Sequence, residues 1–191
     1  MGVFVALKRN TIWDLLGIVI ALLGQATPNF WLGMVLIIIF SVELRVLPIS
    51  GRGTPSHIIL PAVALALSSV GYLTRLTRSS MLDVLGQDYL RTARSKGLAE
   101  SAILINHGIK NAMIPVITMM GIQFGNILTG AFIIETVFAW PGIGRLGVNS
   151  LFERDFPVIQ GVIILSSAVF VLSNLLVDIF YSVLDPRIRL N

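Results

Sequence analysis

The sequence lacks cysteine and has few charged residues. With no cysteine among its 191 residues, it can form neither a disulfide framework nor a thiolate metal site. Charged residues make up 13% of the chain and hydrophobic residues 55%, whereas soluble domains carry about 25% charged residues. The mean hydropathy is +0.86. Such a chain has too little polar surface to cover itself in water, so we expect an all-α integral membrane protein.

Four long stretches contain no Asp, Glu, Lys or Arg. They comprise residues 15–42, 53–74, 111–134 and 156–177. Each is longer than the roughly 20 residues that cross the hydrocarbon core of a bilayer as a helix. The first is too short for two spans and long for one, so we predict a single tilted helix that is disturbed near Pro28. The predicted spans are residues 15–42, 55–74, 111–134 and 157–180. Together they predict one membrane domain of about four transmembrane helices over residues 1–191.

The basic residues are spread unevenly over the connections between these stretches. Ten of the fourteen lie in the N-terminal tail, in the connection 75–110 and at the C-terminus, namely Lys8, Arg9, Arg75, Arg78, Arg91, Arg94, Lys96, Lys110, Arg187 and Arg189. The other two connections hold only Arg45, Arg52, Arg145 and Arg154. Because cytoplasmic loops are enriched in Lys and Arg, we expect both termini and residues 75–110 in the cytoplasm. The same bias accounts for the net charge of +4, without a role for nucleic acid.

A polar segment, residues 88–100, lies within the predicted cytoplasmic connection. Asp88 near one end and Lys96 near the other favour a helix over 88–96, and Gly97 suits the left-handed position that ends a helix. A second apolar stripe follows and predicts a short second helix, with Leu98, Ala102, Ile105 and Ile109 on one face. These residues alone leave two interpretations open: a surface that grips a cytoplasmic partner, or an amphipathic helix lying on lipid headgroups.

Several motifs follow one another along the chain. They are Pro28-x-Phe30-Trp-Leu-Gly33; Thr92-Ala-Arg-Ser-Lys-Gly97 with His107, Asn111, Ala112 and Pro115; Glu135-x-Val-Phe138-x-x-Pro141-Gly-Ile-Gly144; and Asp178-x-x-Tyr181-x-x-x-Asp185-Pro-Arg187. In this order they resemble the permease subunits of binding-protein-dependent ABC importers, most of all the dipeptide, oligopeptide and nickel branch. The second motif resembles the cytoplasmic EAA loop of that family. The general pattern has Glu-Ala-Ala where this chain has Arg91-Thr92-Ala93, which matches the peptide-branch variant instead.

The resemblance implies a type I ABC importer permease fold with a cytoplasmic coupling loop at residues 75–110. It also implies a multi-pass subunit, not an enzyme, in a bacterial or archaeal plasma (inner) membrane. Its partners would be a second permease subunit, two ATP-binding cassette subunits and an extracytoplasmic solute-binding protein. The sequence has no Walker motif, so we expect no directly bound cofactor, with ATP and Mg on the partner ATPase subunits. Peptides, glutathione and nickel chelates are all carried by relatives with these motifs.

The resemblance further implies which residues couple the chain to the ATPase. They are Arg91, Thr92, Ala93, Arg94, Lys96, Gly97, Leu98, Ile103, His107 and Asn111. We expect Leu98, Ile103 and Ile105 to dock in an apolar groove, as amphipathic helices do. The basic side chains would orient this helix or bind anionic headgroups, and Gly97 would set the elbow between the two helices.

Polar residues inside the third span have two interpretations. Thr118, Gln123, Asn126 and Thr129 could line the translocation pathway, or they could form interhelical hydrogen bonds in a closely packed bundle. No metal site is expected, since His57 and His107 lie on opposite predicted sides of the membrane. Pro141 and the glycines after it predict a tight re-entrant turn in an external loop.

The resemblance begins after the second helix of the family, so the usual N-terminal helices are lacking from this sequence. The alternative to an importer subunit is therefore a truncated or non-transporting membrane scaffold, or a channel-like subunit. A channel would form homo-oligomers that conduct without ATP. A scaffold would bind partners regardless of changes in the segment from Arg91 to Leu98.

Overall fold

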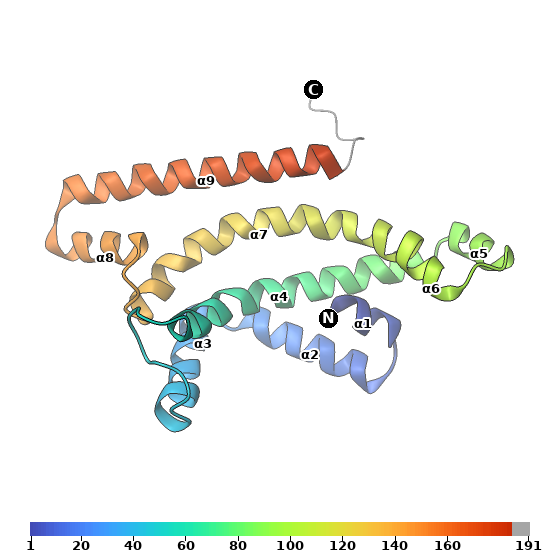
Figure 1. Ribbon diagram of the computed structural model, residues 1–191, viewed down its shortest axis with the longest axis horizontal. Coiled ribbons are helices and arrows are strands. Elements are labelled where there is room, and N and C mark those ends of the chain that lie inside the picture. The colour runs from blue at the N-terminus through green and yellow to red at the C-terminus, as the bar shows by residue number, and fades with distance from the viewer. Residues whose placement is uncertain (185–191) are drawn as a thin grey trace. The chain divides into compact units, whose positions relative to one another are not determined.

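The computed structural model describes the backbone of residues 1–184 and the side chains of residues 1–123, 127, 130–177 and 179. Within these residues every regular element is a helix, as Figure 1 shows, so the predicted all-α fold is confirmed. Some residues that the sequence singled out lie outside the described part, namely the side chains of Asn126, Thr129, Asp178 and Tyr181, and all of residues 185–187.

The helices follow one another with short connections. In order they are α1 (Gly2–Leu7), α2 (Ile12–Ala26), α3 (Asn29–Leu36), the π-helix η1 (Ile37–Glu43), α4 (Ser56–Leu85), α5 (Asp88–Ser95), α6 (Glu100–Ile103), the π-helix η2 (Leu104–Ile109), α7 (Lys110–Val137), α8 (Ile143–Glu153) and α9 (Phe156–Leu184). Of the long helices α4, α7 and α9, α4 contains the predicted span 55–74 except for its first residue, and α7 and α9 contain the predicted spans 111–134 and 157–180. Their 30, 28 and 29 residues correspond to about 42–45 Å at 1.5 Å per residue.

Two of the described helices are long and apolar enough to cross a membrane: α4, and α9 over Phe156–Val177. The pair formed by α2 and the α3–η1 helix gives a third candidate if it counts as one broken span. Many large apolar side chains are exposed, among them Leu15, Ile164 and Val171, each at 60% or more. Apolar surface on this scale requires a lipid or protein neighbour.

The first apolar stretch is not the single tilted helix that its length predicts. Helix α2 ends at Ala26 and α3 begins at Asn29, so the helix is interrupted at Thr27 and Pro28. Pro28 has an extended backbone, with φ −62° and ψ 135°, and its carbonyl accepts the first bond of α3, from the N–H of Leu32 at 3.0 Å. Proline has no N–H and disfavours helical backbone in the residue before it, so the disturbance expected near Pro28 is a full break.

The chain forms two compact units. Unit 1 contains Met1–Gln25 and Val70–Gly121, and unit 2 contains Ala26–Ser69 and Ile122–Asn191. In unit 1 the buried residues Ala6, Met81 and Ala112 form a small core. Apolar side chains of α1, the end of α4 and η2 surround this core, and Leu90 and Ile103 are also fully buried.

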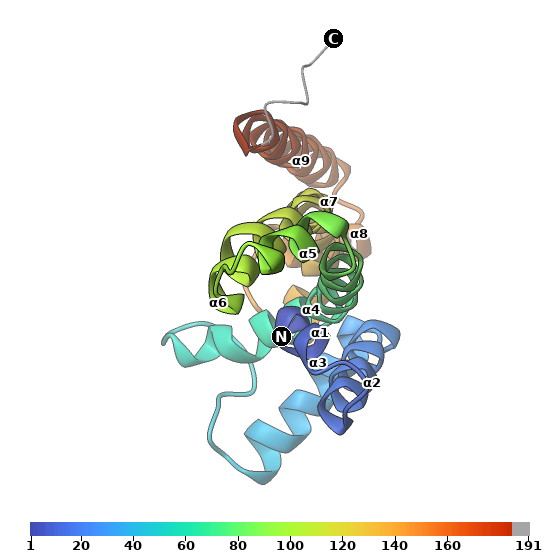
Figure 2. The same ribbon diagram turned by 90° about the vertical axis from the view of Figure 1, so that its right-hand side faces the viewer.

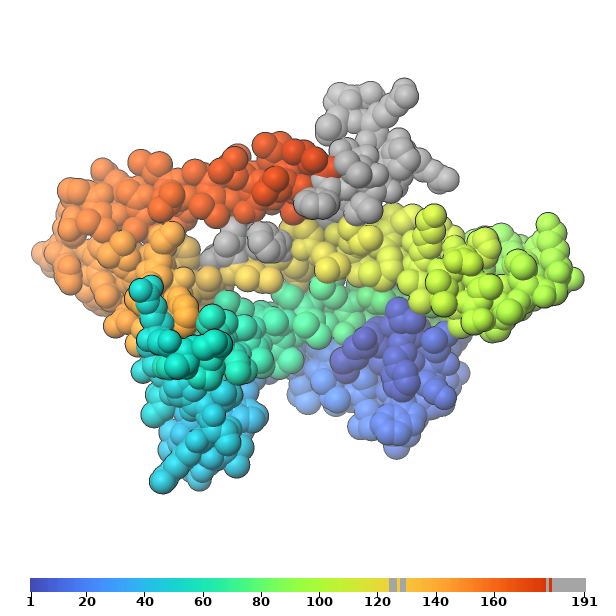
Figure 3. Space-filling view, in the orientation of Figure 1, coloured from blue at the N-terminus to red at the C-terminus, as the bar shows by residue number. Residues whose placement is uncertain are grey.

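Unit 2 has its own core, in which Leu60 and Ala64 of α4 meet Ile134 and Phe138 at the end of α7. The carbonyl of Phe138 accepts a hydrogen bond from the N–H of Gly51 at 2.9 Å, which ties the loop after η1 to this core. Helix α8 packs against the first part of α9, and the two form one continuous surface, orange to red, in Figure 3.

The predicted re-entrant turn at Pro141 is instead the start of helix α8, with Gly142 as its N-cap. The carboxylate of Glu135 accepts a hydrogen bond from the backbone N–H of Arg145 at 3.0 Å, so it caps the helix and meets the positive end of its dipole. The Arg145 guanidinium donates to the carbonyl of Ala139 at 2.5 Å. A carboxylate seven residues before the glycine thus converts the expected turn into an ordered helix N-terminus.

Candidate functional site

The polar segment in unit 1 forms a helix followed by a sharp turn. Helix α5 covers Asp88–Ser95, one residue shorter than predicted, with Asp88 in its first turn and Arg94 in its last. Both charges are favourable for the helix dipole. Leu90 is fully buried and anchors α5 to unit 1, whereas Arg91, Thr92, Arg94 and Lys96 are exposed. Figure 2, where α5 and α6 face the viewer, shows the chain reversing direction between them.

Gly97 ends α5 in the left-handed conformation that the sequence predicts, with φ +78°. The N–H of Gly97 donates to the carbonyl of Arg94 at 2.9 Å, and the N–H of Leu98 donates to that of Ala93 at 3.4 Å. These two bonds form a Schellman motif, which satisfies carbonyls that the end of a helix leaves unpaired. A Cβ on Gly97 would meet no atom within 4 Å, so the position requires glycine for its backbone angle and not for space.

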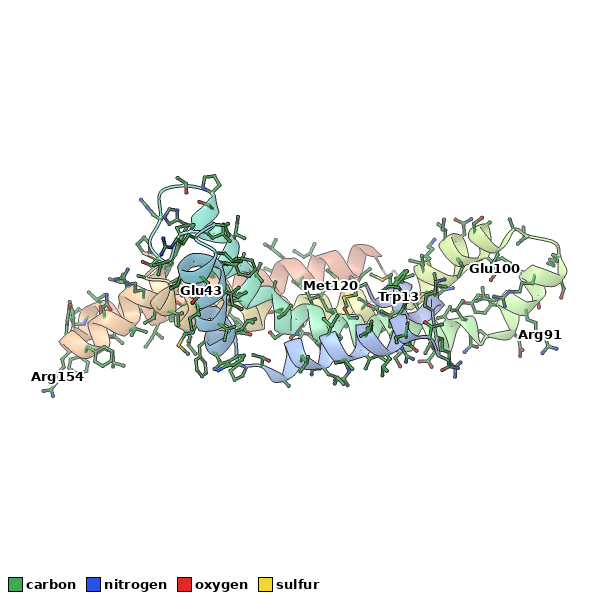
Figure 4. The ribbon with its side chains drawn as sticks, turned by 90° about the horizontal axis from the view of Figure 1, so that it is seen from below. Trp13, Glu43, Arg91, Glu100, Met120 and Arg154 are labelled. Carbon is green, nitrogen blue, oxygen red and sulfur yellow. The ribbon has the colours of Figure 1, made fainter. Side chains whose placement is uncertain are left out.

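An ion pair bridges the turn. Nε of Arg94 donates to Oε2 of Glu100 at 3.1 Å, and Nη2 donates to Oε1 at 2.8 Å. This bidentate geometry joins the end of α5 to the first turn of α6. Hydrogen bonding and the charge of Arg94 hold the pKa of the Glu100 carboxyl below its ordinary value, and Glu100 raises the pKa of Arg94. In Figure 4, Arg91 lies at the outer edge of the same turn.

A second connection joins α5 to the start of α7. The side-chain amide of Asn111 donates to the hydroxyl of Tyr89 at 3.0 Å and to the carbonyl of His107 at 2.9 Å. Asn111 therefore bridges α5 and the π-helix η2, and His107 takes part through its backbone. Sequence reasoning selected Arg94 and Asn111 but missed their partners, Glu100 and Tyr89. The pairing of Arg94 and Glu100 across a predicted glycine turn was detectable by charge, whereas nothing in the sequence relates Tyr89 to a residue 22 positions away.

The second helix after Gly97 differs from the prediction in two respects. It is not short, because α6, η2 and α7 follow one another without a gap from Glu100 to Val137. The predicted connection 75–110 is shorter at its other end too, since α4 continues to Leu85. The extension of α4 contains no glycine or proline, and neither Gly108 in η2 nor Pro115 in α7 ends the second helix.

The apolar face expected to dock on a partner is only partly exposed. Leu98 and Ile105 are 47% and 63% exposed, but Ile103 is completely buried and faces the interior of unit 1. The assignment of Ile103 as a docking residue is therefore wrong. Residues two apart on a helix point to different sides, so Ile103 faces the interior of unit 1 whereas Ile105 is exposed. Leu98, which precedes α6, is exposed as well.

The residues predicted to line a pathway are distributed over both units. Thr118 lies in unit 1, where its hydroxyl donates to the carbonyl of Ile114 at 3.1 Å, and Gln123 lies in unit 2 and is half-buried. Asn126 and Thr129 are outside the described side chains. Among the described residues no group of three or more His, Cys, Asp or Glu side chains could hold a metal ion.

A helical chain with membrane-length, largely apolar helices and an exposed, capped helix-turn segment belongs to the class of helical membrane proteins. The family of binding-protein-dependent transport system inner membrane components matches residues 1–190, and the chain belongs to this family. The sequence-based assignment to ABC importer permeases is thus confirmed at the level of the family.

Individual relatives agree with this family. The glutathione transport system permease protein GsiC of Salmonella paratyphi A is 48% identical over 189 residues, which are 99% of this chain and 62% of that protein. The protein of the same name from Escherichia coli strain K12 is 49% identical over 188 residues, 98% of this chain and 61% of the relative. The chain thus spans about three fifths of the length of the curated relatives that it matches.

Proposed function

We propose that the chain is a permease subunit of an ABC importer that uses the polar segment to receive the motion of a partner ATPase. The observation that carries the proposal is the fold of this segment in a chain matched to the family over residues 1–190. The motion of an ATPase can move a membrane helix only if the contact between them is rigid. The Schellman turn at Gly97, the Arg94–Glu100 pair and the Tyr89–Asn111 bond each stiffen the connection from α5 to α7.

The exposed residues of the segment supply the contact itself. Leu98 and Ile105 offer apolar side chains for a groove on the ATPase, while Arg91 and Lys96 orient the segment by charge. In this proposal residues 86–99, between α4 and α6, lie in the cytoplasm, as do both termini. ATP and Mg are bound by two ATPase subunits, and an external binding protein delivers the solute.

The translocation pathway is proposed to form between this chain and a second permease subunit. The exposed apolar surface of α9 is suited to such a neighbour, because membrane helices associate by packing their apolar side chains against one another. Thr118, Gln123, Asn126 and Thr129 would line the pathway on α7. The alternative, that they pack helices together, would be favoured if Asn126→Leu transported at the normal rate.

The proposed solute is a peptide of the size of glutathione. The curated relatives are named as glutathione transport permeases, and glutathione is a tripeptide. The aligned residues are 48% and 49% identical, over 99% and 98% of this chain. Discrimination between peptides is assigned mainly to the external binding protein.

Affinity purification of the tagged chain from its native membranes, followed by uptake measurements, tests this function. The chain should co-purify with an ATPase and a second permease, and the assembly should take up radiolabelled glutathione only when ATP is hydrolysed. A homo-oligomer that conducts without ATP would replace the importer with a channel. Recovery of the chain with other membrane proteins but without an ATPase would point to a scaffold.

Substitution of Gly97 tests the coupling role within that assembly. Gly97→Val should abolish substrate-stimulated ATP hydrolysis while the subunit still inserts, because a β-branched residue strongly disfavours φ +78°. Gly97→Asn is the matched control, since asparagine tolerates the left-handed region, and it should retain most of the stimulation. Normal substrate-stimulated ATP hydrolysis in Gly97→Val would contradict the proposed role of the Gly97 turn in coupling.

A further inference from the structure

A surface cavity in unit 1 lies between α2 and α4, away from the polar segment. Its volume is about 350 Å³. It is lined by apolar and basic side chains together, namely Ile18, Tyr72, Arg75, Leu76, Arg78 and Ser79. A cavity with both characters fits a ligand that is itself part charged and part apolar.

The two arginines of this cavity are held in place by partners on α2. Nε and Nη2 of Arg78 donate to the two carboxylate oxygens of Asp14, each at 2.7 Å. Nη1 of Arg75 donates to Oε1 of Gln25 at 2.7 Å. A guanidinium carries five N–H donors, more than these bonds use, so both groups can still donate to a ligand. Fixed guanidinium groups are well suited to phosphate oxygens.

The charge around the cavity is positive despite Asp14. The two arginines and the carboxylate leave one net positive charge, and Arg75 is exposed. The turn before α2 adds Lys8 and Arg9, which are also exposed. The N–H of Asn10 in this turn donates to Asp14 at 3.0 Å, which places the turn beside the Asp14–Arg78 pair. An anion is therefore favoured here over a neutral or cationic ligand.

The position of the cavity along its helices favours a lipid over a soluble anion. Arg75 and Arg78 follow directly after the predicted span 55–74, at the level where basic side chains reach lipid headgroups. Ile18 and Leu76 line the apolar part of the cavity, and α2 continues the apolar surface with exposed Val19 and Leu22. Acyl chains could lie against this surface while a phosphate meets the arginines.

We propose that this cavity binds the phosphodiester headgroup of an anionic phospholipid from the cytoplasmic leaflet. Arg75 and Arg78 bind the phosphate oxygens, Tyr72 and Ser79 supply hydroxyl groups beside them, and α2 supports the acyl chains. Inorganic phosphate shares the headgroup chemistry but would leave the apolar half of the cavity unused. The site does not depend on a transport role for the chain.

Native mass spectrometry of the full chain in detergent tests the site. The retained fraction of phosphatidylglycerol is compared with that of phosphatidylcholine with the same acyl chains. Wild type should retain phosphatidylglycerol several-fold more tightly, and Arg75→Gln should lower this preference about fivefold, the loss expected for one cation near an anionic surface. Arg52→Gln removes the same charge from an exposed position in the loop between η1 and α4 and should leave the preference unchanged.

Three results would overturn the assignment. One is equal retention of the two lipids by wild type. Another is an equal loss of preference in Arg52→Gln and Arg75→Gln, which would mean a diffuse attraction to net charge. The third is an Arg75-dependent rise in the melting temperature with inorganic phosphate as large as that with phosphatidylglycerol, which would assign the cavity to a free anion. Arg75→Gln should melt like wild type in lipid-free detergent, so that its effect reports binding.

Discussion

Single residues in unit 1 show two different reasons for glycine. Gly97 is surrounded by open space and adopts φ +78°, so its role is conformational. Gly71 lies inside α4 and has no positive φ, so its backbone does not require glycine. A Cβ there, however, would collide with the carbonyl oxygen of Ala21 and come within 3.2 Å of the backbone N of Gln25. Gly71 therefore sets how closely α2 and α4 approach, which is the usual use of small residues between membrane helices.

Gly71→Ala should destabilise unit 1 by about 1–3 kcal/mol, because the added methyl group meets backbone atoms that cannot move independently. The measurement is unfolding of the purified chain in a mixed detergent titration, followed by circular dichroism. Gly161→Ala in α9 is the control. The added Cβ at residue 161 would meet no atom within 4 Å, so the better helix propensity of alanine should raise the free energy of unfolding of this variant by up to about 1 kcal/mol. Equal stability of the two variants would contradict the close contact.

The sequence predicts the role of Gly97 and misses that of Gly71. A glycine after a polar helix with a basic last turn is a local signal, since the cap depends only on neighbouring residues. The contact of Gly71 with Ala21 joins residues 50 positions apart, and a glycine within an apolar run carries no local mark of its partner. The burial of Ile103 is likewise not visible locally, because unit 1 is built from helices far apart in the sequence, with core residues from α1, α4 and α7.

At the scale of elements, α5 is joined to the following helix at both of its ends. Tyr89 near its start bonds to Asn111, and Arg94 near its end pairs with Glu100. The Arg94 and Glu100 side chains are 42% and 57% exposed, so water screens the pair and its contribution is small. Its value lies in fixing the direction of one helix against the next.

The Arg94–Glu100 pair should make this turn sensitive to acid. Because the pKa of Glu100 is lowered in the folded chain, the stabilisation is present above the unfolded pKa and is lost as the pH falls through the folded pKa. At neutral pH, Glu100→Gln should speed hydrogen exchange of the α5 and α6 amides by less than about fivefold. At a pH below the folded pKa, the variant and wild type should exchange alike.

Glu153→Gln provides the control for this measurement. Glu153 is exposed at the end of α8, and within the described residues it forms no ion pair. Its substitution should not alter exchange in α5 and α6 at either pH. A difference between Glu100→Gln and wild type that persisted in acid would assign the effect to helix propensity or to the helix dipole instead of the ion pair.

The boundaries of elements were predictable where one residue type decides them. Asp88 and Gly97 set the limits of α5, and Pro28 sets the break between α2 and α3, although its effect was underestimated. The continuations of α4 to Leu85 and of α6 into α7 were not predicted. Charged residues end an apolar stretch without ending a helix, so the span and the helix that contains it have different limits.

At the scale of the whole molecule, the sequence predicts the membrane class and the family, and the family match over residues 1–190 agrees. Composition and the length of apolar stretches suffice for the membrane class, because a bilayer imposes both, whereas the family follows from the resemblance of the ordered motifs. The side of the membrane on which each connection lies follows from charge alone and stays a prediction. A span count of four also stays a prediction, since α4 and α9 and at most one broken pair pass as candidate spans among the described residues.

The absence of cysteine allows the predicted topology to be tested directly. A single cysteine introduced at exposed Ser95, the last residue of α5, should react with a membrane-impermeant maleimide only in inverted vesicles. A cysteine at exposed Glu153, the last residue of α8, should react only in intact cells or right-side-out spheroplasts. Wild type contains no cysteine and gives the background of the measurement. Labelling of Ser95→Cys from outside would place the polar segment beyond the reach of any cytoplasmic ATPase. The ten basic residues on one side predict that Ser95→Cys is labelled from the cytoplasmic side and Glu153→Cys from the outside.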